Sequence, residues 1–258
     1  MPARGKFIVL EGIDGSGKRT QMEMLARALA LKKIEFTRVS FPRYEGFFGK
    51  MAAQFLNGEF GPLEAVDPHF SALLYAGDRL ESKPELEAAL AEGRTVLADR
   101  YIGSNLAHQG ARVPPRKRTE FLKWLKQLEY EIYGLPKEDI VVYLHVPPKE
   151  AQRLVGKKAA RAYTKRRRDL QEANLAHLKA ASEVYEELSR QSNWVRIECL
   201  DVARERIRKI EDKALRKVNR RSHKAAAVAL RTPEAIHEEI LAAVEARTFP
   251  VLSASAKG

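Results

Sequence analysis

A glycine-rich turn, Gly12-Ile-Asp-Gly-Ser-Gly-Lys18, is the part of the sequence whose residue types and spacing point most directly to chemistry. It satisfies the pattern G-x-x-x-x-G-K, in which glycines let backbone N–H groups surround a phosphate while the lysine reaches the β- and γ-phosphate oxygens. A helix that begins at such a turn also directs the positive end of its dipole at the bound anion. The turn therefore predicts a site for the triphosphate of ATP. The residues expected to form this site are Gly12, Gly15, Ser16, Gly17, Lys18, Arg19 and Thr20.

The position after Lys18 departs from the usual pattern, because it holds Arg19 where such loops commonly have a serine or threonine that contacts Mg²⁺. Thr20 comes one place later and is expected to point elsewhere on the helix. Magnesium must then be held through other oxygens, and Asp99, at the end of a predicted strand, is the candidate ligand. Arg19 either adds positive charge beside the phosphates or lies on a solvated helix face, and the sequence leaves both readings open.

Short apolar runs that alternate with helical periodicity position these residues. The runs predicted as strands are 6–10, 36–41, 95–99, 139–145 and 194–199. The predicted helices are one from the turn to about 33, then 46–57, 67–81, 84–92, one over 175–188, and one from Thr232 to about 247. This alternation predicts an α/β protein with a three-layer α/β/α P-loop NTPase fold, built on a five-stranded parallel sheet. We expect a single domain over 1–248 and a disordered tail over 249–258.

The composition excludes several protein classes. A single cysteine, Cys199, excludes an internal disulfide framework and fits a reducing compartment. No apolar stretch approaches the length needed to cross a bilayer, and the first residues lead straight into a strand pattern without the features of a signal peptide. The sequence therefore predicts a cytoplasmic protein.

The net charge of +12 is unevenly distributed along the chain. Residues 149–168 have a net charge of +8 and residues 202–231 another +8, so the rest of the chain is at −4. Two basic segments on a mildly acidic body indicate local tasks for the positive charge rather than a uniformly basic nucleic-acid-binding surface.

Five motifs follow one another in a fixed order on the expected elements. They are Glu11-Gly-Ile-Asp-Gly-Ser-Gly-Lys-Arg-Thr20, Phe41-Pro-Arg-Tyr44, Leu74-Tyr-Ala-Gly-Asp-Arg79, Asp99-Arg-Tyr101 leading to Ser104-Asn105, and a basic stretch that ends Asp169-x-x-Glu172. Together they resemble the thymidylate kinase family, over residues 5–201 and 232–247. The resemblance implies transfer of the γ-phosphate of ATP to dTMP, giving dTDP for dTTP synthesis, with Mg²⁺ as cofactor and a homodimer as the assembly.

The resemblance also assigns expected roles at the acceptor. Asp14 is expected near the deoxyribose 3′-hydroxyl, and Arg43 and Arg100 are expected to bind the acceptor phosphate. Phe41 is expected to pack on the base side.

For the base itself, the resemblance implies that Tyr75 stacks on thymine and that Arg79 bonds the carbonyl edge of the ring. Asn105 falls where the family lines the base pocket. His108 falls there too, although a satisfied structural histidine explains it equally well.

Residues 149–168 match the family's lid by position. Their lysines and arginines are expected to close over ATP and to neutralise charge on the phosphoryl group in transit. The P-loop has Gly15-Ser16 where some family members carry an arginine, so we expect the lid to supply a catalytic arginine, either Arg153 or Arg161. The full set of expected catalytic residues is Lys18, Arg43, Arg100, Arg153 and Arg161. No general base is needed, since a phosphate monoester is already anionic at neutral pH.

The basic segment 202–231 is an insertion relative to the resemblance. Ile207, Ile210, Ala214 and Val218 fall on one face at helical spacing. Three interpretations remain open: a solvated helical elaboration, a contact with nucleic acid or another acidic partner, and a remodelled adenine end of the donor pocket.

Two other functions compete with a dTMP kinase. One is another nucleoside or nucleoside-monophosphate kinase on the same fold, which a panel of acceptors would distinguish. The other is a nucleic-acid-associated P-loop protein that uses its basic segments, for which salt-dependent nucleic-acid binding would be the mark.

Overall fold

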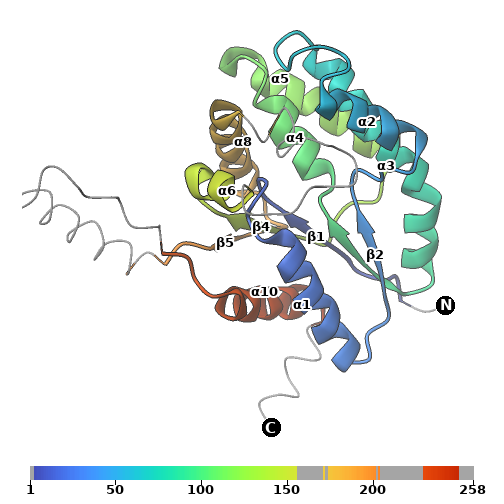
Figure 1. The fold of residues 1–258 in the computed structure, drawn as a ribbon. Helices are drawn as coiled ribbons and strands as arrows, with labels where there is room; N and C mark the ends of the chain where they lie inside the picture. Colours follow the sequence, from blue (N-terminus) through green and yellow to red (C-terminus); the bar gives the residue numbers. More distant parts are fainter. Residues whose placement is uncertain (1–2, 156–170, 172–173, 202, 204–228, 250–258) are drawn as a thin grey trace, which may run out of the picture.

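The protein is seen in a computed structural model that describes residues 3–155, 171, 174–201, 203 and 229–249 (Figure 1). Five strands form one parallel sheet in the order β2-β3-β1-β4-β5. The strands are β1 (Phe7–Glu11), β2 (Phe36–Ser40), β3 (Thr95–Asp99), β4 (Ile140–His145) and β5 (Trp194–Glu198). The predicted α/β class and five-stranded parallel sheet are confirmed.

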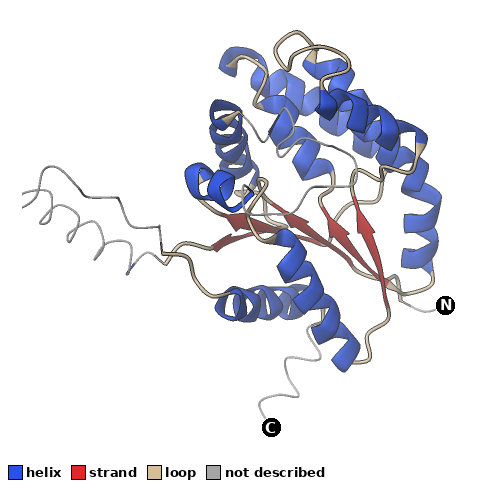
Figure 2. Cartoon of the chain, in the orientation of Figure 1, coloured by secondary structure: helices blue, strands red, loops and turns tan. Residues whose placement is uncertain are grey.

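The central strands are apolar on both faces because helices cover both. All five residues of β1 are buried, and only His145 at the end of β4 is partly exposed. The edge strand β2 has no fully buried residue, which fits its position at the border of the sheet. Figure 2 shows the sheet between two layers of helices. Helices α1 and α10 pack on one face and α3, α4 and α8 on the other (Figure 1).

The helical elements have the following bounds in the structure. They are α1 (Lys18–Leu31), α2 (Phe47–Asn57), α3 (Pro68–Ala91), α4 (Ile102–Gly110), α5 (Pro115–Lys126), the π-helical turn η1 (Gln127–Ile132), α6 (Pro148–Val155), α8 (Leu175–Leu188) and α10 (Pro233–Thr248).

The prediction of two helices over 67–81 and 84–92 was wrong. A single helix, α3, runs through Pro84. Proline removes one backbone hydrogen bond from a helix interior and crowds the preceding turn. Buried residues on both sides of Pro84, including Arg79, Ser82 and Leu86, pack one continuous face of α3 into the protein. Tertiary packing therefore outweighs the local cost. The helices over 102–132 had no counterpart in the prediction.

The carboxyl ends of the strands form the edge at which parallel α/β sheets bind ligands. Strand β1 lies between β3 and β4. The helices that follow β1 and β3, which are α1 and α4, pack on opposite faces of the sheet, so the sheet has its switch point between these two strands. The glycine-rich turn follows β1, and Asp99-Arg100 ends β3. The topology thus brings two of the sequence motifs to one place.

The ends of the predicted insertion lie next to each other. Leu200 and Leu230 form an isolated antiparallel bridge. The Asp201 N–H donates to the Ala229 carbonyl at 2.9 Å, and the Arg231 N–H donates to the Cys199 carbonyl at 2.9 Å. The chain therefore leaves β5 and returns to α10 through a hydrogen-bonded neck. The predicted amphipathic face within 202–231 and the predicted disordered tail lie outside the described residues, apart from the ends named here and Phe249.

Among the described residues, no helix is both long enough and apolar enough to span a membrane.

Candidate active site

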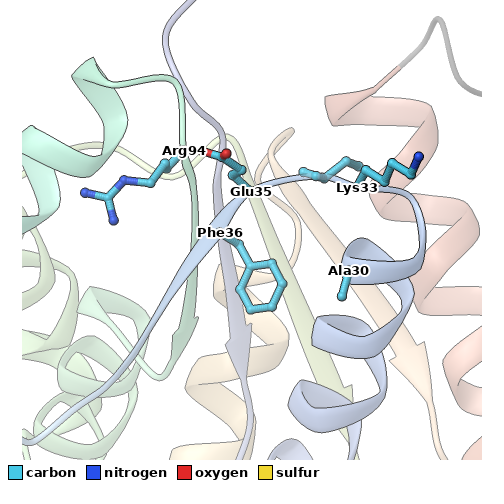
Figure 3. Close-up of a pocket in the computed structure, with 6 residues that line it drawn as sticks. Ala30, Lys33, Glu35, Phe36 and Arg94 are labelled. Atoms are coloured by element: carbon cyan, nitrogen blue, oxygen red, sulfur yellow. The ribbon is translucent and has the colours of Figure 1, made fainter.

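A cavity of about 840 Å³ opens at the carboxyl edge of the sheet. Its walls come from the glycine-rich turn, the ends of β2 and β3, and helices α3, α4 and α6. A smaller pocket of about 400 Å³ lies at the opposite end of β2, where Figure 3 shows Lys33 and Arg94 pointing away from each other. The Arg94 guanidinium there is already bonded to Thr37 Oγ1 and to Glu92. The larger cavity is the one that gathers charged side chains, and it is the candidate active site.

Glycine is required in the turn for two different reasons. Gly12, Gly15 and Gly17 all have positive φ, at 145°, 89° and 93°. At Gly15 a Cβ atom would also lie 2.2 Å from the carbonyl oxygen of Ala151, in helix α6. Helix α6 therefore packs directly on the turn. A Cβ atom at Gly17 would meet no atom within 4 Å, so only the backbone conformation demands glycine there.

Lys18 begins α1, and its side chain is buried under the turn. Its Nζ donates to the carbonyl oxygens of Gly12 at 2.8 Å and Ile13 at 3.1 Å. Burial and the nearby positive charge of Arg100 lower the pKa of Lys18 to about 8, although three neighbouring acids act in the opposite direction. This buried ammonium lacks a full counter-charge, and the phosphates of a nucleotide would supply it.

Arg100 faces the same turn from the end of β3. Its backbone has a φ of 71°, a conformation that is uncommon for a residue with a side chain. Its guanidinium donates to Asp14 Oδ1 at 2.8 Å, to Ser104 Oγ at 2.9 Å and to the Gly12 carbonyl at 3.2 Å. Burial opposes its charge, but the surrounding acids, Asp14 first among them, outweigh burial and raise the pKa of Arg100 well above its ordinary value. Asp14 and Arg100, each predicted separately to bind the acceptor, are thus brought together at one wall of the cavity.

Glu11, the last residue of β1, holds this wall in place. Its carboxylate accepts hydrogen bonds from the backbone N–H groups of Tyr101 at 2.8 Å and Ser104 at 2.9 Å, and from the hydroxyls of Ser104 at 2.6 Å and Tyr185 at 2.9 Å. The N-cap residue of α4, Tyr101, supplies no side-chain cap of its own, so Glu11 satisfies those donors instead. Burial raises the pKa of Glu11 in spite of these donors.

Asp99 has the features expected of a magnesium ligand. It lines the cavity, and its Oδ1 is buried without a hydrogen-bond partner in the part of the chain that the structure describes. The same residues contain no cluster of three or more His, Cys, Asp or Glu side chains that could hold a metal ion without help. Mg²⁺ in phosphoryl-transfer sites is commonly bound by one or two carboxylates together with substrate phosphates and water. The donor set therefore fits a magnesium ion that arrives with a nucleotide.

The other end of the cavity contains a buried polar network. Arg79 lies on α3 and is 2% exposed; its Nε and Nη2 donate to the carboxylate of Glu129 at 2.6 and 2.8 Å. Asn105 lies on α4, and its Nδ2 donates to the same carboxylate at 2.8 Å and to the Ala72 carbonyl at 3.0 Å. Arg79 and Asn105 line the cavity, as expected of base-binding residues, whereas Glu129 lies behind them.

The predicted aromatic residues also line this end. Phe41 is buried with its ring centroid 5.7 Å from that of Tyr101, and Tyr75 packs edge-to-face on Phe55 at 6.3 Å. His108 lies beside them, with its Nδ1 3.3 Å from His177 Nε2. Burial holds the pKa of His108 well below its ordinary value, so the ring is neutral at physiological pH.

Three predicted cations are paired with side-chain carboxylates in the structure. The Arg43 guanidinium pairs with Glu85 at 2.8 Å, and that of Arg153 pairs with Glu150 at 2.8 Å. Neither Arg43 nor Arg153 is among the described residues that line the cavity, although Tyr44 and Leu154 are. Arg19 is at the cavity's rim, where its 86% exposed side chain pairs with Glu23 at 3.3 Å.

Ser16 is buried, and Thr20 is exposed at the cavity rim. Arg161 and the other basic lid residues after Val155 lie outside the described residues, as do Asp169 and Glu172.

Sequence reasoning missed Glu11, Tyr44 and Glu129 as members of this site. Glu129 had a signal: it follows Leu125 by four residues on the face of α5 and η1 that is buried, and an acid on a buried face needs a partner. Tyr44 follows Arg43 in its motif, and no spacing or charge pattern assigned the tyrosine a role of its own.

The sequence matches the family model described as thymidylate kinase over residues 10–213. It is 34% identical over 141 residues to a thymidylate kinase of Mycobacterium tuberculosis, covering 54% of this chain and 65% of that protein. The identity to human thymidylate kinase is 34% over 143 residues, covering 55% and 62%. For a probable thymidylate kinase of Pyrobaculum aerophilum it is 37% over 148 residues, covering 57% and 67%. These alignments span about two thirds of the relatives' length.

A thymidylate kinase structure from Candida albicans shares the fold. Its TM-score is 0.59 at 19% sequence identity, and the superposition covers 90% of this chain and 100% of that chain.

Proposed function

The chain belongs to the thymidylate kinase family, and from this membership we propose that it transfers the γ-phosphate of ATP to dTMP, giving ADP and dTDP for dTTP synthesis. The observation that carries the proposal is one cavity with two chemically different ends. Lys18 and Arg100 place positive charge at one end, while Arg79 and Asn105 place hydrogen-bonding groups at the other, beside the aromatic side chains of Phe41 and Tyr75.

At the phosphate end, the reaction needs positioning and charge compensation rather than a base. The acceptor is a phosphate monoester whose second pKa is near 6, so its oxygen attacks as an anion. Lys18 at the turn would contact the donor's β- and γ-phosphates, and Arg100 from the end of β3 would contact the acceptor phosphate. Asp14, which pairs with Arg100 and lines the cavity, would accept a hydrogen bond from the sugar. Two anions are thereby brought together between two cations.

Asp99 would hold Mg²⁺ together with the phosphates of ATP. When bound, the ion would offset the negative charge of the phosphate oxygens.

Arg43, Arg153 and Arg161 stay proposals for further phosphate contacts. The side chain of Arg43 is 30% exposed and that of Arg153 is 38% exposed, and among the described residues each forms an ion pair with one carboxylate. Exposed pairs of this kind contribute little to stability, so a phosphate could replace either carboxylate at small cost.

A homodimer is part of the proposal. Phe70, Leu73 and Leu80 lie on one side of α3 and are 41%, 39% and 38% exposed, and Phe47 at the start of α2 is 68% exposed. An apolar face of this kind is a candidate protein–protein contact. Leu73→Glu combined with Leu80→Glu should shift the mass measured by light scattering from dimer to monomer.

The buried, lone Cys199 supports a cytoplasmic location.

The test is an acceptor panel with ADP formation as the readout. We expect ADP with dTMP, less with dUMP, and little with CMP, AMP or thymidine. Lys18→Ala should abolish the activity while leaving the fold intact by circular dichroism. Absence of ADP with dTMP and Mg²⁺ would contradict the proposal. If DNA or RNA binding that falls steeply with salt survived Lys18→Ala, the nucleic-acid-associated alternative would take its place.

A further inference from the structure

Glu129 stands behind the base end of the cavity without lining it. It lies in η1, is fully buried, and accepts hydrogen bonds from three N–H groups: Arg79 Nε and Nη2 and Asn105 Nδ2. The turn that presents it is π-helical, with the Tyr133 N–H donating to the Leu128 carbonyl five residues earlier at 2.9 Å. Such turns often mark functional positions in helices.

The network fixes which way the Asn105 amide faces. The two groups around its Nδ2 are the Ala72 carbonyl and the Glu129 carboxylate, and both can only accept hydrogen bonds. A flipped amide would place three acceptor oxygens together. Asn105 Oδ1 is therefore turned away from them, and it is buried with no hydrogen-bond partner among the described residues. It is an acceptor that awaits an N–H.

The same carboxylate fixes the Arg79 guanidinium. Glu129 engages Nε and Nη2 in a two-point contact, which leaves Nη1 as the nitrogen not bound by it. Because Arg79 and Asn105 both line the cavity, the pocket contains one oriented acceptor and one oriented donor.

We propose that Glu129 is a positioning residue that sets the hydrogen-bond polarity of the base pocket and so selects thymine or uracil over cytosine. This inference rests on the proposed function. Thymine and uracil have an N3–H donor beside carbonyl acceptors, which complements the Asn105 oxygen and the Arg79 N–H. Cytosine has the reverse pattern, with an N3 acceptor beside an N4 amino donor. Without Glu129, only the Ala72 carbonyl holds the Asn105 amide, so its amino group can turn toward the cavity and donate to the N3 of cytosine.

The decisive variant is Glu129→Gln, which keeps the shape and exchanges one acceptor oxygen for an amino donor. That amino group must face either the Nε–H of Arg79 or the amide of Asn105, so one of the two loses its orientation. The matched control is Glu138→Gln. Glu138 is also a buried glutamate, and it accepts hydrogen bonds from the Tyr130 hydroxyl at 2.8 and 3.0 Å rather than from Arg79 or Asn105.

The measurements are calorimetric affinities for dTMP and dCMP and the kcat/KM of each with saturating ATP. We expect the ratio of dTMP to dCMP to fall at least about tenfold in Glu129→Gln, the scale of one well-oriented base contact. The KM for dTMP should rise while the KM for ATP stays unchanged. Glu138→Gln should keep the wild-type ratio. A Glu129→Gln protein with a lower Tm but an unchanged ratio of dTMP to dCMP would overturn the inference. The role of Glu129 in the wild-type protein would then be stability alone.

A second variant covers the case in which Glu129→Gln does not fold. Glu129→Asp retains the charge, but its shorter side chain cannot reach both partners, so the same fall in ratio is expected. In the wild-type protein, the Asn105 side-chain amide protons should exchange slowly with water before any nucleotide is added, as seen by NMR with Asn105→Ser for assignment. Rapid exchange would overturn the inference. A wild-type protein that phosphorylates no dTMP would instead count against the proposed function itself.

Discussion

At the scale of single residues, two largely buried cations, Lys18 and Arg100, face the phosphate turn. Burial and the charge of Arg100 lower the pKa of Lys18, whereas Asp14, Asp99 and Glu11 act in the opposite direction. A group in that balance changes its protonation when a polyanion arrives.

We expect ATP binding to take up protons above neutral pH. The pKa of Lys18 is about 8 in the free protein, and bound phosphates would raise it. The complex then binds more protons than the free protein between about pH 8 and 10, so ATP affinity falls as the pH rises through this range. Calorimetry with Mg-ATP in two buffers of different ionisation enthalpy measures the uptake. It should be clear at pH 8.5 and small at pH 7; equal values at both pH values would contradict the assignment of Lys18.

Gly15→Ala and Gly17→Ala separate two roles of glycine in the turn. Both residues have φ near +90°, so both substitutions should cost about 1–2 kcal/mol in backbone strain. Only at Gly15 does the new Cβ collide with the Ala151 carbonyl. Gly15→Ala should therefore have the lower Tm and the weaker ATP binding, as measured by thermal melts and calorimetry. Equal losses in the two variants would mean that the packing of α6 on the turn does not matter.

The site was predictable to the extent that its chemistry is local in sequence. Lys18 and its glycines lie within seven residues, and Asp99-Arg100 ends a recognisable strand. Glu11 and Glu129 were missed because their partners lie 93 and 50 residues away and are brought close only by the fold. The position of the Arg43 guanidinium against Glu85 depends equally on how α3 packs.

At the scale of elements, strands were predicted to within a residue or so because each is a short apolar run bounded by polar residues or glycine. Helices depend more on tertiary packing. Helix α4 lacks a side-chain cap of its own, and Glu11 from β1 accepts from its first backbone N–H groups instead. The residues at the start of α4 therefore predict a helix N-terminus only weakly. Helix α3 continues through a residue that normally ends helices.

Pro84→Ala should stabilise the protein. Pro84 is exposed in the interior of α3 and cannot donate a backbone hydrogen bond to the turn before it. Alanine restores that donor and removes the ring. We expect the free energy of unfolding to rise by about 1–3 kcal/mol, and the Tm to rise by about 2–4 °C for each kcal/mol. Calorimetric melting is the measurement, and Glu87→Ala, at an exposed position on the same helix, is the control. An unchanged or lower Tm would show that α3 is adapted to the proline.

At the scale of the whole molecule, the neck between Leu200 and Leu230 joins the two ends of a basic stretch of sequence. Residues 202–228 have a net charge of +7, which is more than half of the charge of the chain. Because the two sides of the neck are hydrogen-bonded neighbours, the body of the protein does not depend on the segment to bring β5 and α10 together.

Replacing 202–228 by Asn-Gly should preserve the enzyme. A two-residue turn of this type joins neighbouring antiparallel strands, and here it would connect Asp201 to Ala229. We expect a Tm within about 2 °C of the wild type, since the hydrogen bonds of the neck already hold the two ends of the replaced stretch together. The kcat and both KM values should be unchanged in steady-state assays. A raised KM for ATP alone would favour the interpretation in which the segment shapes the adenine end, and loss of salt-dependent DNA binding would favour a nucleic-acid contact.

The four hydrogen bonds of Glu11 have a consequence for synthesis on the ribosome. The carboxylate is made early, yet its partners arrive with Tyr101, Ser104 and finally Tyr185, 174 residues later. Translation proceeds at about 5–20 residues per second, so the Glu11 carboxylate is without its full set of native hydrogen-bond donors for on the order of ten seconds. The wall that orients Arg100 is therefore completed only after most of the polypeptide has emerged, and nucleotide binding by a nascent chain must wait for α8.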